Sequence, residues 1–78
     1  MIGFLANFAR RARDFSEVPG RPYVWLELAP EGILVRAQHK AIRGNHILLW
    51  EQIGMAREEV RSAMVDQAIA RAALPVMR

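Results

Sequence analysis

HILLWEQIGMAREEVRSAMVDQAIARAAL, residues 46–74, contains the longest helical pattern in the chain, and the elements before it are expected to cover it. It opens with the apolar run Ile47–Trp50, which has the length of a buried strand. The residues that follow carry apolar side chains three and four positions apart, the spacing of one helical face. These are Ile53, Ala56, Val60, Ala63 and Met64. We therefore predict a strand, His46–Trp50, that passes directly into a long helix ending before Pro75.

Beyond Met64 the apolar band widens to include Val65, Ala68, Ile69 and Ala72. A helix that packs on a sheet explains such a band, and this is its ordinary meaning. The alternative is that Val65, Ile69 and Ala72 form a second apolar strip for a partner or for another copy of the chain. That alternative predicts a self-associating structural subunit.

The chain before this stretch predicts a helix and a loop. Residues 2–15 place four apolar side chains on one helical face. They are Leu5, Phe8, Ala12 and Phe15. The segment Ser16–Pro22 holds two prolines and a glycine, which cannot continue a helix and so predict a loop.

Two strands follow the loop. Residues 23–29 alternate in polarity, and the return strand begins at Ile33, after a turn that contains Pro30 and Gly32. Arg43–Asn45 is interpreted as the next turn. We predict an α+β fold with the order α-β-β-β-α, in which a three-stranded antiparallel meander packs against an N-terminal and a long C-terminal helix. Residues 1–78 are expected to form a single small domain.

The phase of the third strand stays open at this point. Its core face carries either Leu48 and Trp50 or Ile47 and Leu49. In the first two strands the alternation is clearer, because it assigns one apolar face to the helices. That face holds Val24, Leu26, Leu28, Ile33, Val35 and Ala37.

The opposite face of the same two strands holds aromatic, charged and apolar side chains. They are Tyr23, Trp25, Glu27, Leu34, Arg36 and Gln38. Aromatic residues and arginine dominate protein interfaces, so this face suits a binding surface. The equally balanced alternative is ordinary cross-strand packing, in which Arg36 pairs with Glu27.

The segment from Arg36 to His46 contains five basic or titratable residues and no acidic one. They are Arg36, His39, Lys40, Arg43 and His46. A basic hairpin can bind a phosphate backbone, since each contact releases counterions. It can also meet an acidic protein surface, or simply be a solvated loop.

The composition of the chain excludes several kinds of chemistry. The chain has 78 residues, a net charge of +3, a hydrophobic fraction of 53% and no cysteine. Disulfides, thiolate catalysis and cysteine-bound zinc are thereby excluded, and a reducing cytoplasm is favoured. No apolar run approaches the length of a membrane span, and the start of the chain does not have the pattern of a signal peptide.

No constellation of residues indicates a reaction. Ser16 and Ser62 lack the surroundings of a nucleophile, and Glu58 and Glu59 point to different sides of a helix. Two histidines are too few for a zinc site. We predict a protein that is not an enzyme, with no metal and no cofactor.

The order α-β-β-β-α resembles that of the double-stranded-RNA-binding domain. That family binds RNA through lysines that open its last helix and through a long loop between its first two strands. Here the helix opens with Glu51-Gln52-Ile53, and the loop is the tight, acidic Pro30-Glu31-Gly32. RNA binding is therefore not carried over from the resemblance.

In size, lack of cysteine and lack of catalytic residues the chain is similar to small phage-encoded inhibitors of host defences, above all anti-CRISPR proteins. That resemblance implies a binding protein that occludes a host protein or ribonucleoprotein complex. We expect a monomer or weak dimer that binds through five residues. They are Tyr23, Trp25, Arg36, Lys40 and Arg43. The alternative is a nucleic-acid-binding domain that uses the hairpin 36–46.

Overall fold

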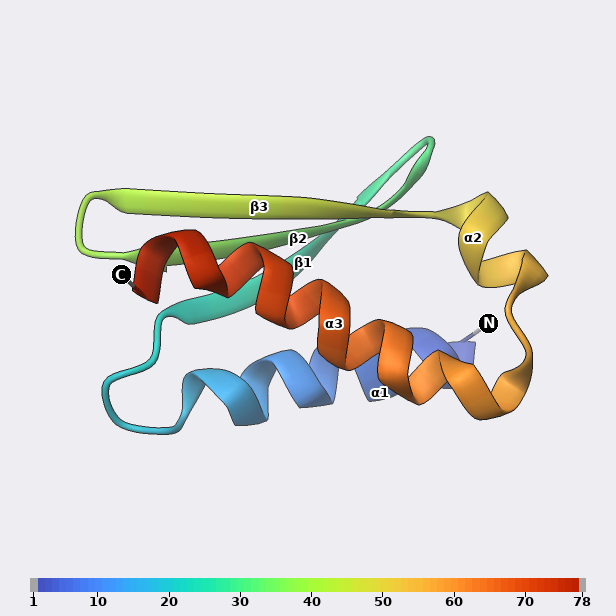
Figure 1. Ribbon diagram of the computed structural model, residues 1–78, viewed down its shortest axis with the longest axis horizontal. Helices are drawn as coiled ribbons and strands as arrows, with labels where there is room; N and C mark the ends of the chain where they lie inside the picture. Colours follow the sequence, from blue (N-terminus) through green and yellow to red (C-terminus); the bar gives the residue numbers. More distant parts are fainter. Residues whose placement is uncertain (1, 78) are drawn as a thin grey trace.

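A computed structural model describes residues 2–77. Helix α1 (Ile2–Ser16) is followed by strands β1 (Tyr23–Ala29), β2 (Gly32–His39) and β3 (Ile42–Leu49), and then by helices α2 (Trp50–Met55) and α3 (Glu58–Met77), as Figure 1 shows. The three strands form one antiparallel sheet in the order β1-β2-β3. The predicted α+β fold and its α-β-β-β-α order are confirmed, with the C-terminal helical region divided in two.

Both long helices pack on the same face of the sheet (Figure 1). Helix α1 packs mainly on β1, whereas α3 crosses β2 and β3. We call the covered face the inner face and the opposite one the outer face. Since α1 and α3 lie on the inner face, none of the helices that the structure describes covers the outer face.

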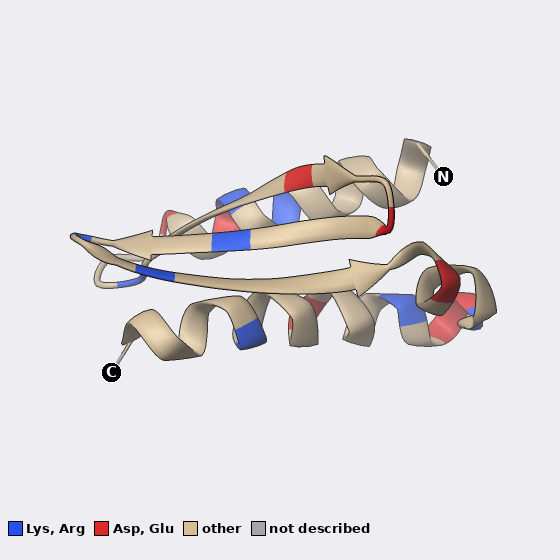
Figure 2. Cartoon of the chain, turned by 90° about the horizontal axis from the view of Figure 1, so that it is seen from above, with Lys and Arg blue, Asp and Glu red and all other residues tan. Residues whose placement is uncertain are grey.

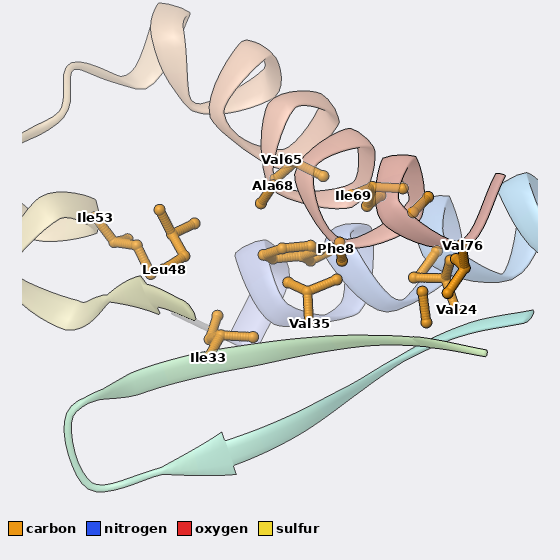
Figure 3. Packing of buried hydrophobic residues seen from close by; sticks show 14 residues of the cluster. Phe8, Val24, Ile33, Val35, Leu48, Ile53, Val65, Ala68, Ile69 and Val76 are labelled. Atoms are coloured by element: carbon orange, nitrogen blue, oxygen red, sulfur yellow. The ribbon is translucent and has the colours of Figure 1, made fainter. Parts of the chain in front are cut away.

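The core fills the space between the two helices and the inner face (Figure 3). Phe8, on the predicted stripe of α1, is fully buried close to Val35 of β2. The inner face supplies Val24, Ile33, Val35, Ala37 and Leu48. Helix α3 contributes Val65, Ala68, Ile69, Ala72, Ala73 and Val76. Alternation in β1 and β2 therefore identified most of the sheet's contribution to the core correctly.

The prediction of one long helix after the third strand is wrong. The chain bends at Ala56, whose backbone is extended (φ −78°, ψ 138°), and α3 begins at Glu58. Ile53 is buried, but on a continuous helix it would point roughly 130° away from the Val65–Val76 band, at 100° per residue. The bend lets both apolar groups face the core.

This bend also overturns the predicted core face of the long helix. Only Ile53 of that set is buried, while Val60 and Ala63 are exposed. The strip Val65, Ile69 and Ala72, considered above as a self-association surface, is buried against the sheet instead. The structure therefore contradicts self-association through that strip.

Two predicted boundaries in the second half of the chain are also corrected. Pro75 does not end α3, which runs on to Met77. A proline in the last turn removes only one backbone donor, and Val76 beyond it is buried in the core. The predicted turn Arg43–Asn45 lies inside β3, and the chain turns at Lys40 and Ala41, with Lys40 in the left-handed region (φ 57°).

The inner face departs from the alternation at one position. Leu28, predicted to face the helices as part of the core, is 66% exposed. The β1–β2 turn extends away from the helices (Figure 1), so none of the elements described between residues 2 and 77 covers this side chain. In β3 the open question of phase is settled, since Leu48 is buried and Leu49 is exposed.

Trp50 joins the sheet to the C-terminal helices. It is the first residue of α2 rather than the last of the strand, and it is half-buried against the core. Its backbone N–H donates to the carbonyl oxygen of Glu31 at 3.0 Å, and its indole Nε1 donates to that of Ala29 at 3.1 Å. Both bonds connect α2 to the β1–β2 turn.

Candidate functional site

The outer face of the sheet brings together side chains from all three strands. Residues directly opposite each other in neighbouring strands share a face, so the register defines rows across it. The first row is Tyr23, Gln38 and Arg43; the second is Trp25, Arg36 and Asn45; the third is Glu27, Leu34 and Ile47. Figure 2 looks down on this face, with α1 and α3 behind it.

An aromatic and cationic stack occupies one half of the outer face. The rings of Tyr23 and Trp25 lie 5.3 Å apart and 22° from parallel. The guanidinium carbon of Arg36 lies 5.9 Å from the centre of the Trp25 ring, within the range of a cation–π contact. We call Tyr23, Trp25 and Arg36 the aromatic stack. Tyr23 is 62% exposed, so the stack is open to a partner.

Glu27 holds the aromatic stack in place. Its carboxylate accepts a hydrogen bond from Trp25 Nε1 at 3.0 Å and forms an ion pair with Arg36 at 3.5 Å. The predicted cross-strand pairing of Arg36 with Glu27 is therefore confirmed. Because the ring, the guanidinium and the carboxylate restrain one another, their side chains lose less conformational freedom on binding than free ones.

The other half of the outer face is apolar. Leu34 and Ile47 are partners in the register and half-buried, and Leu49 lies further along β3 with 36% of its surface exposed. The sequence did not identify Ile47 and Leu49 as part of this face, because the phase of β3 was open. The Arg43–Asn45 turn prediction hid the third strand's contribution in the same way.

The two remaining predicted site residues lie at the β2–β3 end of this face. Arg43 follows the turn and is exposed in the same row as Tyr23. Lys40 forms the turn itself, where its carbonyl oxygen accepts a hydrogen bond from Gln38 Nε2 at 3.0 Å. Four of the five predicted residues thus share the outer face, and Lys40 extends it at the turn between β2 and β3.

The two histidines of the hairpin do not face each other. His39 pairs with Ile42 beside the turn, whereas His46 pairs with Val35 on the inner face. There His46 lies near α3, and burial together with the positive charge of Arg71 lowers its pKa. Among residues 2–77, no group of three or more metal-ligating side chains is placed to hold a metal ion.

A separate cleft of about 390 Å³ lies between α1 and α3. Arg11 crosses it to Asp66, with 2.9 Å between the charged atoms, and Arg21 lies 4.5 Å from the centre of the Phe15 ring. Its two arginines already contact these neighbours. The outer face, which carries all but one of the predicted residues, is therefore the better candidate site.

Comparison with known proteins adds no family to this description. No protein-family model, no curated protein and no solved structure matches the chain. Within residues 2–77, none of the helices combines the length and apolar character needed to cross a membrane.

Proposed function

We propose that this chain is a non-enzymatic, cytoplasmic binding protein that docks on a protein surface through its outer face. The aromatic stack carries the proposal. Tyrosine, tryptophan and arginine are the residues that most often dominate binding energy at interfaces. Here they lie in contact with one another and restrained by Glu27. Prior ordering of this kind reduces the entropic cost of association.

The apolar half of the outer face supports a protein partner. Leu34, Ile47 and Leu49 lie beside the stack, so a partner would cover an apolar patch next to aromatic and charged groups. Protein interfaces have this mixture of an apolar centre and a polar rim. Lys40 and Arg43 lie on the rim, where they would face acidic groups of the partner and accelerate encounter.

We further propose that the partner is a host protein or ribonucleoprotein complex and that binding occludes it. This part rests on the similarity in size and composition to anti-CRISPR proteins. The outer face gives such an inhibitor a means of action, because a rigid sheet can cover a functional surface without any chemistry. The positive charge of its rim argues against mimicry of DNA.

Nucleic-acid binding is the second candidate function, and one observation favours it. Two stacked aromatic rings and three cations lie on or beside one sheet, an arrangement that suits single-stranded nucleic acid. However, Glu27 would lie close to the phosphates, and the apolar half would remain uncovered. The protein partner therefore accounts for more of the face.

Affinity capture from the host tests the proposal. A tagged chain is expressed in its host, the extract is treated with nuclease, and the retained polypeptides are identified. We expect one partner that resists nuclease and is lost with Trp25→Ala. Met55→Ala is the matched control, since Met55 is 80% exposed on α2 and lies outside the outer face. A partner released by nuclease, or retained equally by both variants, would contradict the proposal.

A further inference from the structure

Within residues 2–77, strand β3 forms a free edge of the sheet, since β2 is the one strand that pairs with it. His39 and Ile42 flank the two-residue turn and form a hydrogen-bonded pair in hairpins of this length. Bonded and non-bonded pairs then alternate along an antiparallel ladder. The backbone polar groups of Arg43, Asn45 and Ile47 are therefore directed away from β2, toward the open side.

Two other positions on the sheet's edges, one on β1 and one at the end of β3, carry side-chain caps. On β1, Ser16 Oγ accepts from the backbone N–H of Val24 at 2.8 Å and lies 3.2 Å from that residue's carbonyl oxygen. At the end of β3, Gln52 Oε1 accepts from the N–H of Leu49 at 3.0 Å. Within residues 2–77, the hydrogen bonds of side chains include no such cap on Arg43, Asn45 or Ile47. This stretch of β3 is therefore available for pairing.

Helix α3 lies beneath this edge, on the inner face of the sheet. Asp66 lies on the flank of α3 that meets α1, where it pairs with Arg11. Met64 and Arg71 lie on the opposite flank, which lies past β3 (Figure 2). Between them and the inner face of β3 is a hollow of about 150 Å³. Its lining consists of His46, Leu48, Gln52, Met64, Gln67, Ala68 and Arg71.

The polar groups around the hollow favour a negative charge. Arg71 is exposed, and the two ion pairs found within residues 2–77 involve other arginines. The described lining contains two glutamine amides and a histidine but no carboxylate. Arg43 lies on the other face of the same strand edge. A strand paired with β3 would therefore have a cation on each side of it.

We propose that the β3 edge binds an extended acidic segment of a protein partner by strand addition. The segment pairs its backbone with Arg43, Asn45 and Ile47 and places an acidic side chain in the hollow beside Arg71. Main-chain bonds supply affinity in this binding mode, and the pocket supplies specificity. The inference rests on the proposed function in requiring a protein partner, but it concerns an edge that is separate from the aromatic stack.

A second copy of this chain is a poorer occupant. Pairing two β3 strands would place the cationic flanks of both copies along one short interface, where like charges repel. Each copy would also present to the other's hollow a β3 strand without any acidic residue. An acidic segment from a different protein has neither disadvantage.

Three labelled ten-residue peptides test the inference without the natural partner. In each peptide, valine or threonine alternates with one other residue, which is glutamate in the first peptide, glutamine in the second and lysine in the third. Binding is followed by fluorescence anisotropy and by amide exchange of β3. We expect the glutamate peptide to bind with a Kd of about 100 µM or tighter, and the lysine peptide to show no binding at about 1 mM. The amides of Arg43, Asn45 and Ile47 should become protected.

Two controls identify the edge and the hollow. N-methylation of alternate peptide residues removes backbone donors without changing the protein, and should abolish binding. Arg71→Glu should lower the affinity for the glutamate peptide at least about tenfold. Arg57→Glu, at the exposed bend before α3, should change that affinity less than about twofold. Trp25→Ala should leave peptide binding intact, so loss of the aromatic stack and loss of the edge are distinguishable.

Four results would overturn the inference. They are no binding of the glutamate peptide at about 1 mM, binding that survives N-methylation, equal effects of the Arg71 and Arg57 variants, and equal binding of the lysine peptide. Sedimentation velocity gives a further one: a dimer whose formation protects the β3 amides would show that a second copy occupies the edge.

Discussion

Gly44 of β3 lies directly against the carbonyl oxygen of Ala72 in α3, and a Cβ atom at residue 44 would overlap that oxygen. Gly44 is buried, and its neighbour is helix backbone, which cannot rotate away as a side chain can. The glycine therefore sets how closely α3 approaches the sheet. This contact explains why a glycine that resembles a turn residue in the sequence lies within a strand.

We predict that Gly44→Ala lowers the free energy of unfolding by about 3 kcal/mol, because α3 must move away from β3 and lose buried contacts. Gly54→Ala in α2 is the control, since nothing lies within 4 Å of a Cβ at that position. Alanine favours helix there by up to about 1 kcal/mol. Urea unfolding of both variants measures the difference. Equal stabilities would show that α3 does not pack so closely.

Ser16 provides a second test of the fold. Its hydroxyl accepts a hydrogen bond from the N–H of Val24 and donates one to a carbonyl oxygen. The carbonyl oxygen of Ala12, at 2.8 Å, lies nearer to the hydroxyl than that of Val24 does. We predict that Ser16→Ala costs about 1–3 kcal/mol, since a half-buried N–H of β1 loses its partner. Ser62→Ala, at an exposed position of α3, should cost less than about 0.5 kcal/mol. Faster amide exchange at Val24 would identify the cause; an unchanged rate would refute it.

His46 makes stability depend on pH. Burial and the charge of Arg71 hold its pKa below the usual value. Between the folded pKa and the unfolded value of about 6.5, the unfolded chain binds more protons, so stability falls as the pH drops through this window. We predict that His46→Gln reduces the loss of Tm between pH 7.5 and pH 5, and that His39→Gln, beside the turn, does not. Equal pH profiles for the wild type and His46→Gln would contradict this.

The sequence predicted the order of the elements because each depends on local periodicity. Phe8 and Ala12 on α1, and Val35 on β2, follow their patterns directly into the core. The bend at Ala56 could not be found in this way, because no glycine or proline marks it at that position. It follows from the need of Ile53 and Val65 to face one core, which is a tertiary requirement.

The arrangement of the candidate site was predictable in part for a similar reason. Tyr23, Trp25 and Arg36 lie in strands with clear alternation, so their shared face followed from the pattern. Ile47 lies in a strand with consecutive apolar residues, where alternation carries no information about phase. Its place became visible only through its pairing with Leu34.

The alternative function gives a prediction about charge. If the hairpin binds nucleic acid, Lys40→Glu combined with Arg43→Glu should abolish binding to unrelated duplexes, and the wild type should lose affinity steeply with salt. We expect instead that the wild type binds short DNA and RNA with a Kd weaker than about 10 µM at 150 mM salt, because few counterions are released. Fluorescence anisotropy measures this. Tighter binding that the double variant abolishes would favour the nucleic-acid function.

The clearest test of the outer face as the binding surface is the affinity of the captured partner for Trp25→Ala. We predict that removal of this ring weakens the complex by about 2 kcal/mol, or roughly 30-fold in Kd, while the circular dichroism spectrum and Tm stay close to those of the wild type. Met55→Ala should bind as the wild type does. Equal Kd values for Trp25→Ala, Met55→Ala and the wild type would contradict the claim that the outer face is the binding surface.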